Sequence, residues 1–267
     1  MLNFEKYRHE TSDLWVVFVH GIGGSTLTWK KQLDSFREDY NLLLIDLPGH
    51  GKSQDVSGNL SHKEVNDEIK RVLDYVGITK ADFVGMSLGT LVIMNFAVSY
   101  PSYVNSIILG GAIINVQGIY SHLMRFASVI KEFLPQRATY RVFAEIIMPS
   151  KWHKKSRDIF FREARKLNRR NFLAWMDYVT NVSKQREVMD KLKALKIPTL
   201  FVSGEHDCCF IEGIKKLAGR LSTAKLVILE KCGHVCTIEK WRDFNFQALT
   251  YLKHLHPAQP AMVPVLA

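Results

Sequence analysis

The chain has 267 residues, of which 47% are hydrophobic and 23% are charged, and its formal net charge is +10. This composition is typical of a soluble globular protein, and four cysteines in a chain of this length exclude a small disulfide-stapled domain. No run of about 18 apolar residues indicates a membrane span, and the N-terminus lacks the apolar core of a secretory signal, so we expect a cytoplasmic protein.

The first part of the chain alternates short apolar runs with helical patterns. Residues 14–19 form a continuous apolar run, which is typical of a strand buried on both faces of a parallel sheet. The other predicted elements are an edge strand over 4–9, helices over 27–36, 61–76 and 88–100, and strands over 42–45, 81–84 and 104–110. A Ser61 cap with Glu64 three residues on marks the start of the second helix. This order predicts a mostly parallel sheet with helices on both faces.

The alternation then breaks, because no convincing strand follows until residue 197. Helical patterns interrupted at Pro135 and Pro149 fill this stretch. Strands are predicted again over 197–202 and 226–229, before a final helix over 240–255. We therefore expect an α/β core over residues 1–115 and 194–256, a helical lid inserted over 116–193, and a poorly ordered tail over 257–267.

Residues 85–89 read Gly-Met-Ser-Leu-Gly and join the strand over 81–84 to the next helix. A serine at such a sharp turn holds its hydroxyl above the end of the sheet, and the flanking glycines let neighbouring backbone pass closely. The helix that starts at Leu88 directs free N–H groups and its positive dipole end towards an oxyanion formed beside Ser87. Ser87 is thus the candidate nucleophile.

A nucleophilic serine needs a base, and the base needs an orienting carboxylate. His234 follows the strand over 226–229 through a short loop, and Asp207 follows the preceding strand in the same way, so both lie at the carboxyl edge of the sheet. Glu205 is the competing acid. His50 lies in a turn rich in Gly and Pro and has no evident acid partner, so we expect a structural role for it.

The predicted strand over 14–19 ends in His-Gly-Ile-Gly-Gly-Ser, residues 20–25. This loop lacks the Lys-Ser/Thr pair of a P-loop and the spacing of a dinucleotide site. Beside a nucleophilic serine, its backbone amides can instead bind an oxyanion. We predict the amides of Ile22 and Leu88 as the two donors.

These stretches together resemble the α/β-hydrolase family, and within it the capped esterase, lipase and C–C hydrolase group. The resemblance spans nearly the whole chain and implies Ser87 as nucleophile, His234 as base and Asp207 as orienting acid. It also implies that no cofactor or metal is required. Thr90 departs from the family pattern, because many relatives have a glycine there. A serine rather than an aspartate nucleophile argues against epoxide and haloalkane hydrolysis.

Hydrolysis of a small or medium carboxylic ester is the first expectation. A thioester, a lactone or a C–C substrate remains open on the same residues, because a fold does not fix a function. A slow-turnover small-molecule receptor or signalling protein is an alternative of another class. We expect no nucleic-acid partner, and nothing in the sequence indicates the oligomeric state.

Four cysteines lie beside the proposed catalytic residues, at positions 208, 209, 232 and 236. A redox or metal-binding cluster is one interpretation, since thiolates and imidazole suit zinc. We favour the alternative that these are small side chains packed behind two loops, because cysteine is among the most often buried residue types.

The predicted lid carries the charge excess, with 17 Lys and Arg against 7 Asp and Glu over residues 116–193. Between residues 151 and 170, basic side chains alternate with an apolar stripe of Trp152, Ile159, Phe160, Ala164 and Leu167. This pattern fits a solvated helix face that covers the site. It also fits a surface that attracts an anionic substrate or an anionic lipid membrane.

Overall fold

The computed structural model describes residues 1–56, 60–114, 122, 126, 129, 133–150, 153–180 and 182–257. Within these residues, seven strands form one sheet in the order β1-β3-β2-β4-β5-β6-β7. Strand β1 runs antiparallel to β3, and all other neighbouring pairs are parallel. The strands are β1 (Phe4–Tyr7), β2 (Trp15–Val19), β3 (Asn41–Ile45), β4 (Ala81–Met86), β5 (Val104–Gly110), β6 (Thr199–Gly204) and β7 (Ala224–Leu229). The predicted mostly parallel sheet is confirmed.

Both faces of the sheet are covered by helices, so alternate residues of β2 enter two different apolar clusters. Val17 and Val19 pack with side chains of α2 (His62–Val76) and α3 (Leu88–Ser99). Phe18 packs on the other face, with α1 (Lys30–Arg37) and α11 (Trp241–Leu255). All five residues of β2 are buried, as the continuous apolar run predicts.

Local capping explains where α2 begins and ends. The Ser61 hydroxyl accepts the Glu64 N–H at 3.1 Å, and the Glu64 carboxylate accepts the Ser61 N–H at 3.0 Å. Gly77 then ends the helix with φ 82°, a conformation that costs glycine little. The predicted cap at Ser61 is confirmed.

Three helical features differ from the expectation. The predicted helix over 27–36 divides into a 3-10 turn, η1 (Thr26–Trp29), and α1. A short helix, α10 (Cys236–Glu239), precedes α11, and α9 (Ile211–Ala218) lies where no helix was predicted. Helices of eight residues or fewer span about two turns, which is too little for a periodic signal. A second 3-10 turn, η2 (Pro101–Tyr103), leads into β5.

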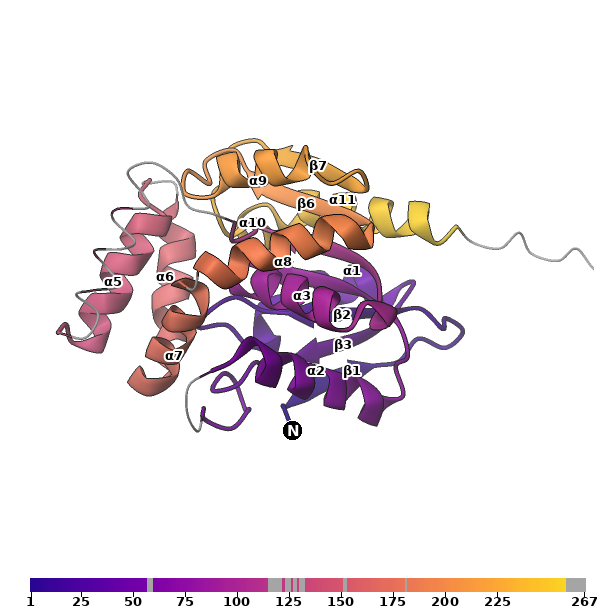
Figure 1. Cartoon of the computed structure of the whole chain (residues 1–267), viewed down its shortest axis with the longest axis horizontal. Coiled ribbons are helices and arrows are strands. Elements are labelled where there is room, and N and C mark those ends of the chain that lie inside the picture. Colours follow the sequence, from indigo (N-terminus) through magenta and orange to yellow (C-terminus); the bar gives the residue numbers. More distant parts are fainter. Residues whose placement is uncertain are drawn as a thin grey trace, which may run out of the picture.

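Between β5 and β6, the described residues form no strand, and the helices with described bounds are α5 (Gln136–Ile147), α6 (Lys154–Ala164), α7 (Arg169–Thr180) and α8 (Val182–Leu195). Figure 1 shows α5, α6 and α7 gathered beyond one end of the sheet, while α8 runs back over α3. We call α5, α6 and α7 the cap. The division into core and lid stays a prediction, and α8 lies against the core although the predicted lid range includes it.

Some sequence-based expectations fall outside the described residues. These are the tail from residue 258 on, and the parts of the predicted lid over residues 116–121, 123–125, 127–128, 130–132, 151–152 and 181, which include Trp152 of the apolar stripe. In the part of the chain that is described, no helix combines the length and apolar character that crossing a membrane requires.

Candidate active site

Ser87 lies at the turn between β4 and α3 in a conformation that non-glycine residues rarely adopt, with φ 53° and ψ −117°. Its N–H donates to the Gly110 carbonyl at 3.0 Å. A Cβ on Gly89 would lie 2.0 Å from the Val19 carbonyl oxygen, so only glycine lets α3 approach β2 this closely. The second glycine of the Gly-Met-Ser-Leu-Gly motif, Gly89, is therefore required because any larger residue would clash with β2.

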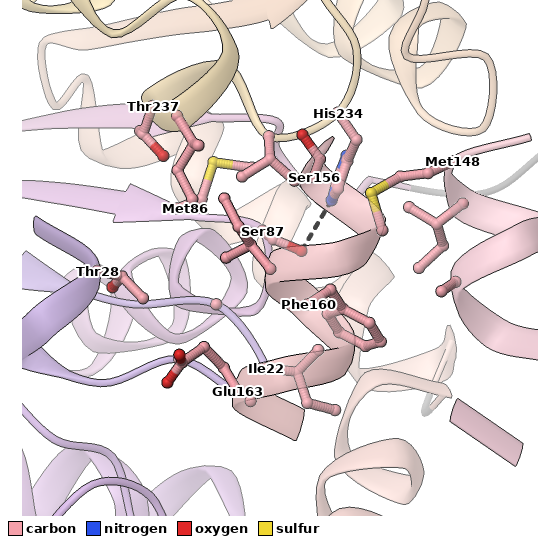
Figure 2. A pocket seen from close by; sticks show the side chains of 18 of the residues that line it. Ile22, Thr28, Met86, Ser87, Met148, Ser156, Phe160, Glu163, His234 and Thr237 are labelled. Carbon is pink, nitrogen blue, oxygen red and sulfur yellow. Dashed lines mark hydrogen bonds between the residues drawn. The ribbon is translucent and has the colours of Figure 1, made fainter. Parts of the chain in front are cut away.

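Ser87, His234 and Asp207 form one hydrogen-bonded chain. The His234 Nδ1–H donates to Asp207 Oδ2 at 3.0 Å, which leaves Nε2 to accept from the Ser87 hydroxyl at 2.9 Å (Figure 2). Asp207 is fully buried and His234 is 3% exposed. A neutral imidazole with its free nitrogen on a hydroxyl can remove the proton from that hydroxyl.

The three side chains come from neighbouring parts of the sheet, after β4, β6 and β7. Glu205, the competing acid, is directed elsewhere. Its carboxylate accepts the Lys231 N–H at 3.0 Å and its side chain is 51% exposed. The structure thus brings Asp207, and not Glu205, to the His234 ring.

The loop over residues 20–25 is supported by two buried histidines. His50 Nε2 accepts the Gly23 N–H at 3.0 Å, and His20 Nδ1–H donates to the Gly21 carbonyl at 2.7 Å. Burial lowers the pKa of both imidazoles, and the neighbouring His20 lowers the pKa of His50 further. Neutral His50 therefore holds the loop, in agreement with the structural role predicted for it.

Ile22 and Leu88 belong to two segments that meet at the pocket of Ser87. Ile22 belongs to the supported loop and lines the same pocket as Ser87. Leu88 is the first residue of α3, where the N–H groups have no intrahelical acceptor. Their assignment as oxyanion donors stays a prediction.

Ser87 and His234 line a pocket between the core and the cap. Its empty space amounts to about 710 Å³, part of which is continuous with open solvent. Helices α5 and α6 and the turn after α5 contribute a mostly apolar wall (Figure 2). Its apolar members include Ile147, Met148, Ile159 and Phe160, and its polar members are Ser156 and Glu163.

A polar link joins the cap to the loop that carries His234. Glu239 accepts the Gly233 N–H at 2.7 Å through one carboxylate oxygen and the Ser156 hydroxyl at 2.6 Å through the other. The His153 ring fills the space beside Gly233, where a Cβ would lie 2.3 Å from it. Helix α6 is thus anchored one residue away from His234.

Thr90 lies in the first turn of α3, directly after Gly89. Its hydroxyl donates to the Ser87 carbonyl at 2.6 Å and accepts the Ile113 N–H at 3.1 Å. Thr90 therefore ties the strained turn at Ser87 to the segment after β5. The sequence analysis does not predict this bridge.

Three of the four cysteines are buried, and only Cys208 is exposed. Burial raises the pKa of Cys209 and of Cys232 to about 12, so both remain thiols at neutral pH. Burial also raises the pKa of Cys236. Among the described residues, no group of three His, Cys, Asp or Glu side chains could hold a metal ion.

Known proteins are similar to this chain over most of its length. The model of the alpha/beta hydrolase fold family matches residues 15–240. A putative carbamate hydrolase of Acinetobacter baylyi is 26% identical over 96% of this chain and 100% of its own length. A 2-hydroxy-6-oxononadienedioate/2-hydroxy-6-oxononatrienedioate hydrolase of Klebsiella pneumoniae is 28% identical over 89% of this chain and 86% of its own.

Solved structures share the same architecture. MenH from S. aureus superposes with a TM-score of 0.80 at 18% identity, over 96% of this chain and 100% of that one. At this level of identity the likeness concerns the fold alone.

Proposed function

Because the chain belongs to the α/β-hydrolase family, we propose that it is a serine hydrolase that cleaves a carboxylic ester of small or medium acyl size through an acyl-enzyme on Ser87. The observation that carries this proposal is the hydrogen-bonded chain from Ser87 through His234 to Asp207, with distances of 2.9 and 3.0 Å. A buried carboxylate, an imidazole and a hydroxyl in this order provide what nucleophilic acyl transfer needs.

In the proposed reaction, His234 takes the hydroxyl proton while Ser87 Oγ attacks the ester carbonyl carbon. The carbonyl oxygen becomes an oxyanion, which the amides of Ile22 and Leu88 stabilise. His234 then gives the proton to the departing alcohol, and water resolves the acyl-enzyme by the same steps in reverse. Asp207 keeps Nδ1 protonated and stabilises the imidazolium. The sequence of steps requires no cofactor.

The pocket supports a mostly apolar substrate. Its cap wall is apolar apart from Ser156 and Glu163, and no Lys or Arg lines it among the residues that the structure describes. The Klebsiella relative is named for a substrate that is a dioate, which carries two carboxylates. A pocket with one acid and no described cation favours a neutral ester over such a compound. Thioester, lactone and C–C bond cleavage stay alternatives on the same residues, and the Acinetobacter relative adds carbamate cleavage to them.

An acyl-chain-length series of p-nitrophenyl esters tests the proposal. We expect multiple turnovers by the wild type and a loss of about 10⁴-fold or more in Ser87→Ala, because the three residues act as a unit. Ser156→Ala, which alters another serine of the same pocket, is the matched control and keeps most of the turnover. Near-normal turnover in Ser87→Ala would refute the assignment, and a single slow turnover would favour the receptor alternative.

A further inference from the structure

The basic and acidic side chains at the C-terminal end of α6 differ in their exposure. The side chains of Arg162 and Lys166 are 66% and 64% exposed, so their charges are directed to solvent. Glu163, between them in sequence, is only 14% exposed and lines the pocket that contains Ser87. The basic character that the sequence assigns to this segment therefore lies outside, while an acid lies inside.

The Glu163 carboxylate is held in an ionised, oriented state. Lys166 Nζ donates to one oxygen at 2.6 Å, and Arg162 Nε donates to the other at 3.1 Å. Burial alone would raise the pKa of this carboxyl, but the two hydrogen bonds outweigh it and hold the pKa below its usual value. Each carboxylate oxygen has a further lone pair to offer a substrate.

The surroundings of the Glu163 carboxylate determine which substrate groups can bind beside it. Figure 2 shows Glu163 and Ile22 both below Ser87 in that view. The nearby walls contain Ile159 and Phe160, which cannot solvate an ion. Arg162 and Lys166 lie largely in water, which screens their charges more than that of Glu163. A substrate group entering here meets Glu163, the one Asp, Glu, Lys or Arg among the described residues that line the pocket.

We propose that Glu163 is a specificity-determining residue, which favours esters carrying a cationic or hydrogen-bond-donating group and disfavours esters carrying a carboxylate. The inference rests on the proposed ester hydrolysis and adds the chemistry of the substrate. An ammonium group beside Glu163 gains a charge-assisted interaction, whereas a carboxylate there places two like charges in a mostly apolar pocket. The basic outer surface of the cap acts at longer range and does not enter the bound complex.

Matched p-nitrophenyl esters with the same leaving group test this. One ends in a trimethylammonium group (4-trimethylammoniobutanoate), and its neutral counterpart of the same shape ends in a tert-butyl group (5,5-dimethylhexanoate). A third, the glutarate monoester, ends in a carboxylate. We expect kcat/KM of the wild type to be roughly tenfold higher for the ammonium ester than for the neutral one, and lowest for the carboxylate. Equal values, or a preference for the carboxylate, would overturn the proposal.

Two variants locate the effect. In Glu163→Gln, the ratio of kcat/KM between the ammonium and neutral esters should fall to about one. Glu145→Gln is the control, because Glu145 lies on the neighbouring α5, is 49% exposed and lies outside the pocket lining. This control should keep the wild-type ratio. An unchanged ratio in Glu163→Gln would remove Glu163 as the cause, and if that variant does not fold, the wild-type ratio alone decides whether the pocket selects cations.

The two proposals fail in different ways. Turnover of the neutral ester by the wild type tests ester hydrolysis, whereas the ratio between esters tests Glu163. If the wild type cleaves none of the three, ester hydrolysis is wrong. The preference is then measured as the dissociation constants of the same uncleaved esters by calorimetry. The same order of affinities would support the role of Glu163, and equal affinities would contradict it.

Discussion

The two sides of the pocket are built on different principles. On the core side, Ser87, His234 and Asp207 follow strands of one sheet, and Ser87 is held in an unusual main-chain conformation with φ 53°. On the cap side, Ser156 and Glu163 project from a helix that meets the core through side-chain contacts. The core side is suited to hold the reacting atoms, and the cap side is suited to choose what reaches them.

The largest expected effect lies on the core side. His234→Ala should lower kcat/KM for a neutral ester by about 10⁴-fold or more, and Asp207→Asn should cost less, because Asp207 orients the base and does not touch the substrate. Glu205→Gln is the control, since its carboxylate bonds Lys231 and not His234. A loss in Glu205→Gln that equals the loss in Asp207→Asn would contradict the assignment of the acid.

Breaking the link that Glu239 makes between the two sides should have an intermediate effect on kcat. Glu239→Ala removes the acceptor of both Gly233 and Ser156, and we expect kcat to fall roughly 10- to 100-fold, because small displacements of a catalytic base are costly. Glu239→Gln should restore most of this activity, since its amide oxygen can still accept the Gly233 N–H.

Ser156→Ala breaks only the half of this link that belongs to the cap. It should raise KM a few-fold and leave kcat nearly unchanged, because Gly233 keeps its acceptor. Steady-state kinetics on the neutral ester separates these outcomes. If Glu239→Ala raises KM alone, the link does not position His234.

The buried His50 predicts a pH effect on the core side. Burial lowers the pKa of His50 in the folded state, whereas the unfolded chain takes up a proton near pH 6.5. The contribution of His50 to the free energy of unfolding is therefore fully present above about pH 6.5. It is lost as the pH falls below that value, by up to about 1.4 kcal/mol per pH unit for one such group.

Urea unfolding between pH 7.5 and 5 measures this slope. His50→Gln, whose amide oxygen can still accept the Gly23 N–H, should make the slope shallower. His254→Gln, at an exposed site on α11, is the control and should leave the slope unchanged. Equal slopes for the wild type and His50→Gln would show that His50 titrates alike in the folded and unfolded states.

The smallest effect is expected on the outer surface of the cap. If its basic residues attract anions, kcat/KM of the carboxylate ester should fall with salt more than that of the neutral ester, by no more than about threefold as the Debye length drops from about 30 to 8 Å. Reversing the exposed Lys154, Arg165 and Arg170 to Glu should remove the difference. If salt lowers kcat/KM equally for both esters in the wild type, the basic residues of the cap form only a solvated surface. The same variant tests attraction to anionic lipid vesicles.

The same contrast explains what the sequence could predict. The strands, the capping box at Ser61 and the placement of Asp207 and His234 all follow from local rules that apply along a few neighbouring residues. The Thr90 bridge, the Glu239 link and the inward direction of Glu163 join residues from separate elements, or depend on how a helix is rotated against the core. Basic neighbours also masked Glu163, because composition cannot tell which side of a helix a charge occupies.

Trapping the covalent intermediate tests the central claim most directly. The wild type should be mixed with a slowly hydrolysed p-nitrophenyl ester, quenched in acid and analysed by peptide mass spectrometry. We predict a mass increase of one acyl group on the peptide that contains Ser87, and its absence in Ser87→Ala. Multiple turnovers with no acylated peptide, or acylation of Cys208 in place of Ser87, would contradict the account.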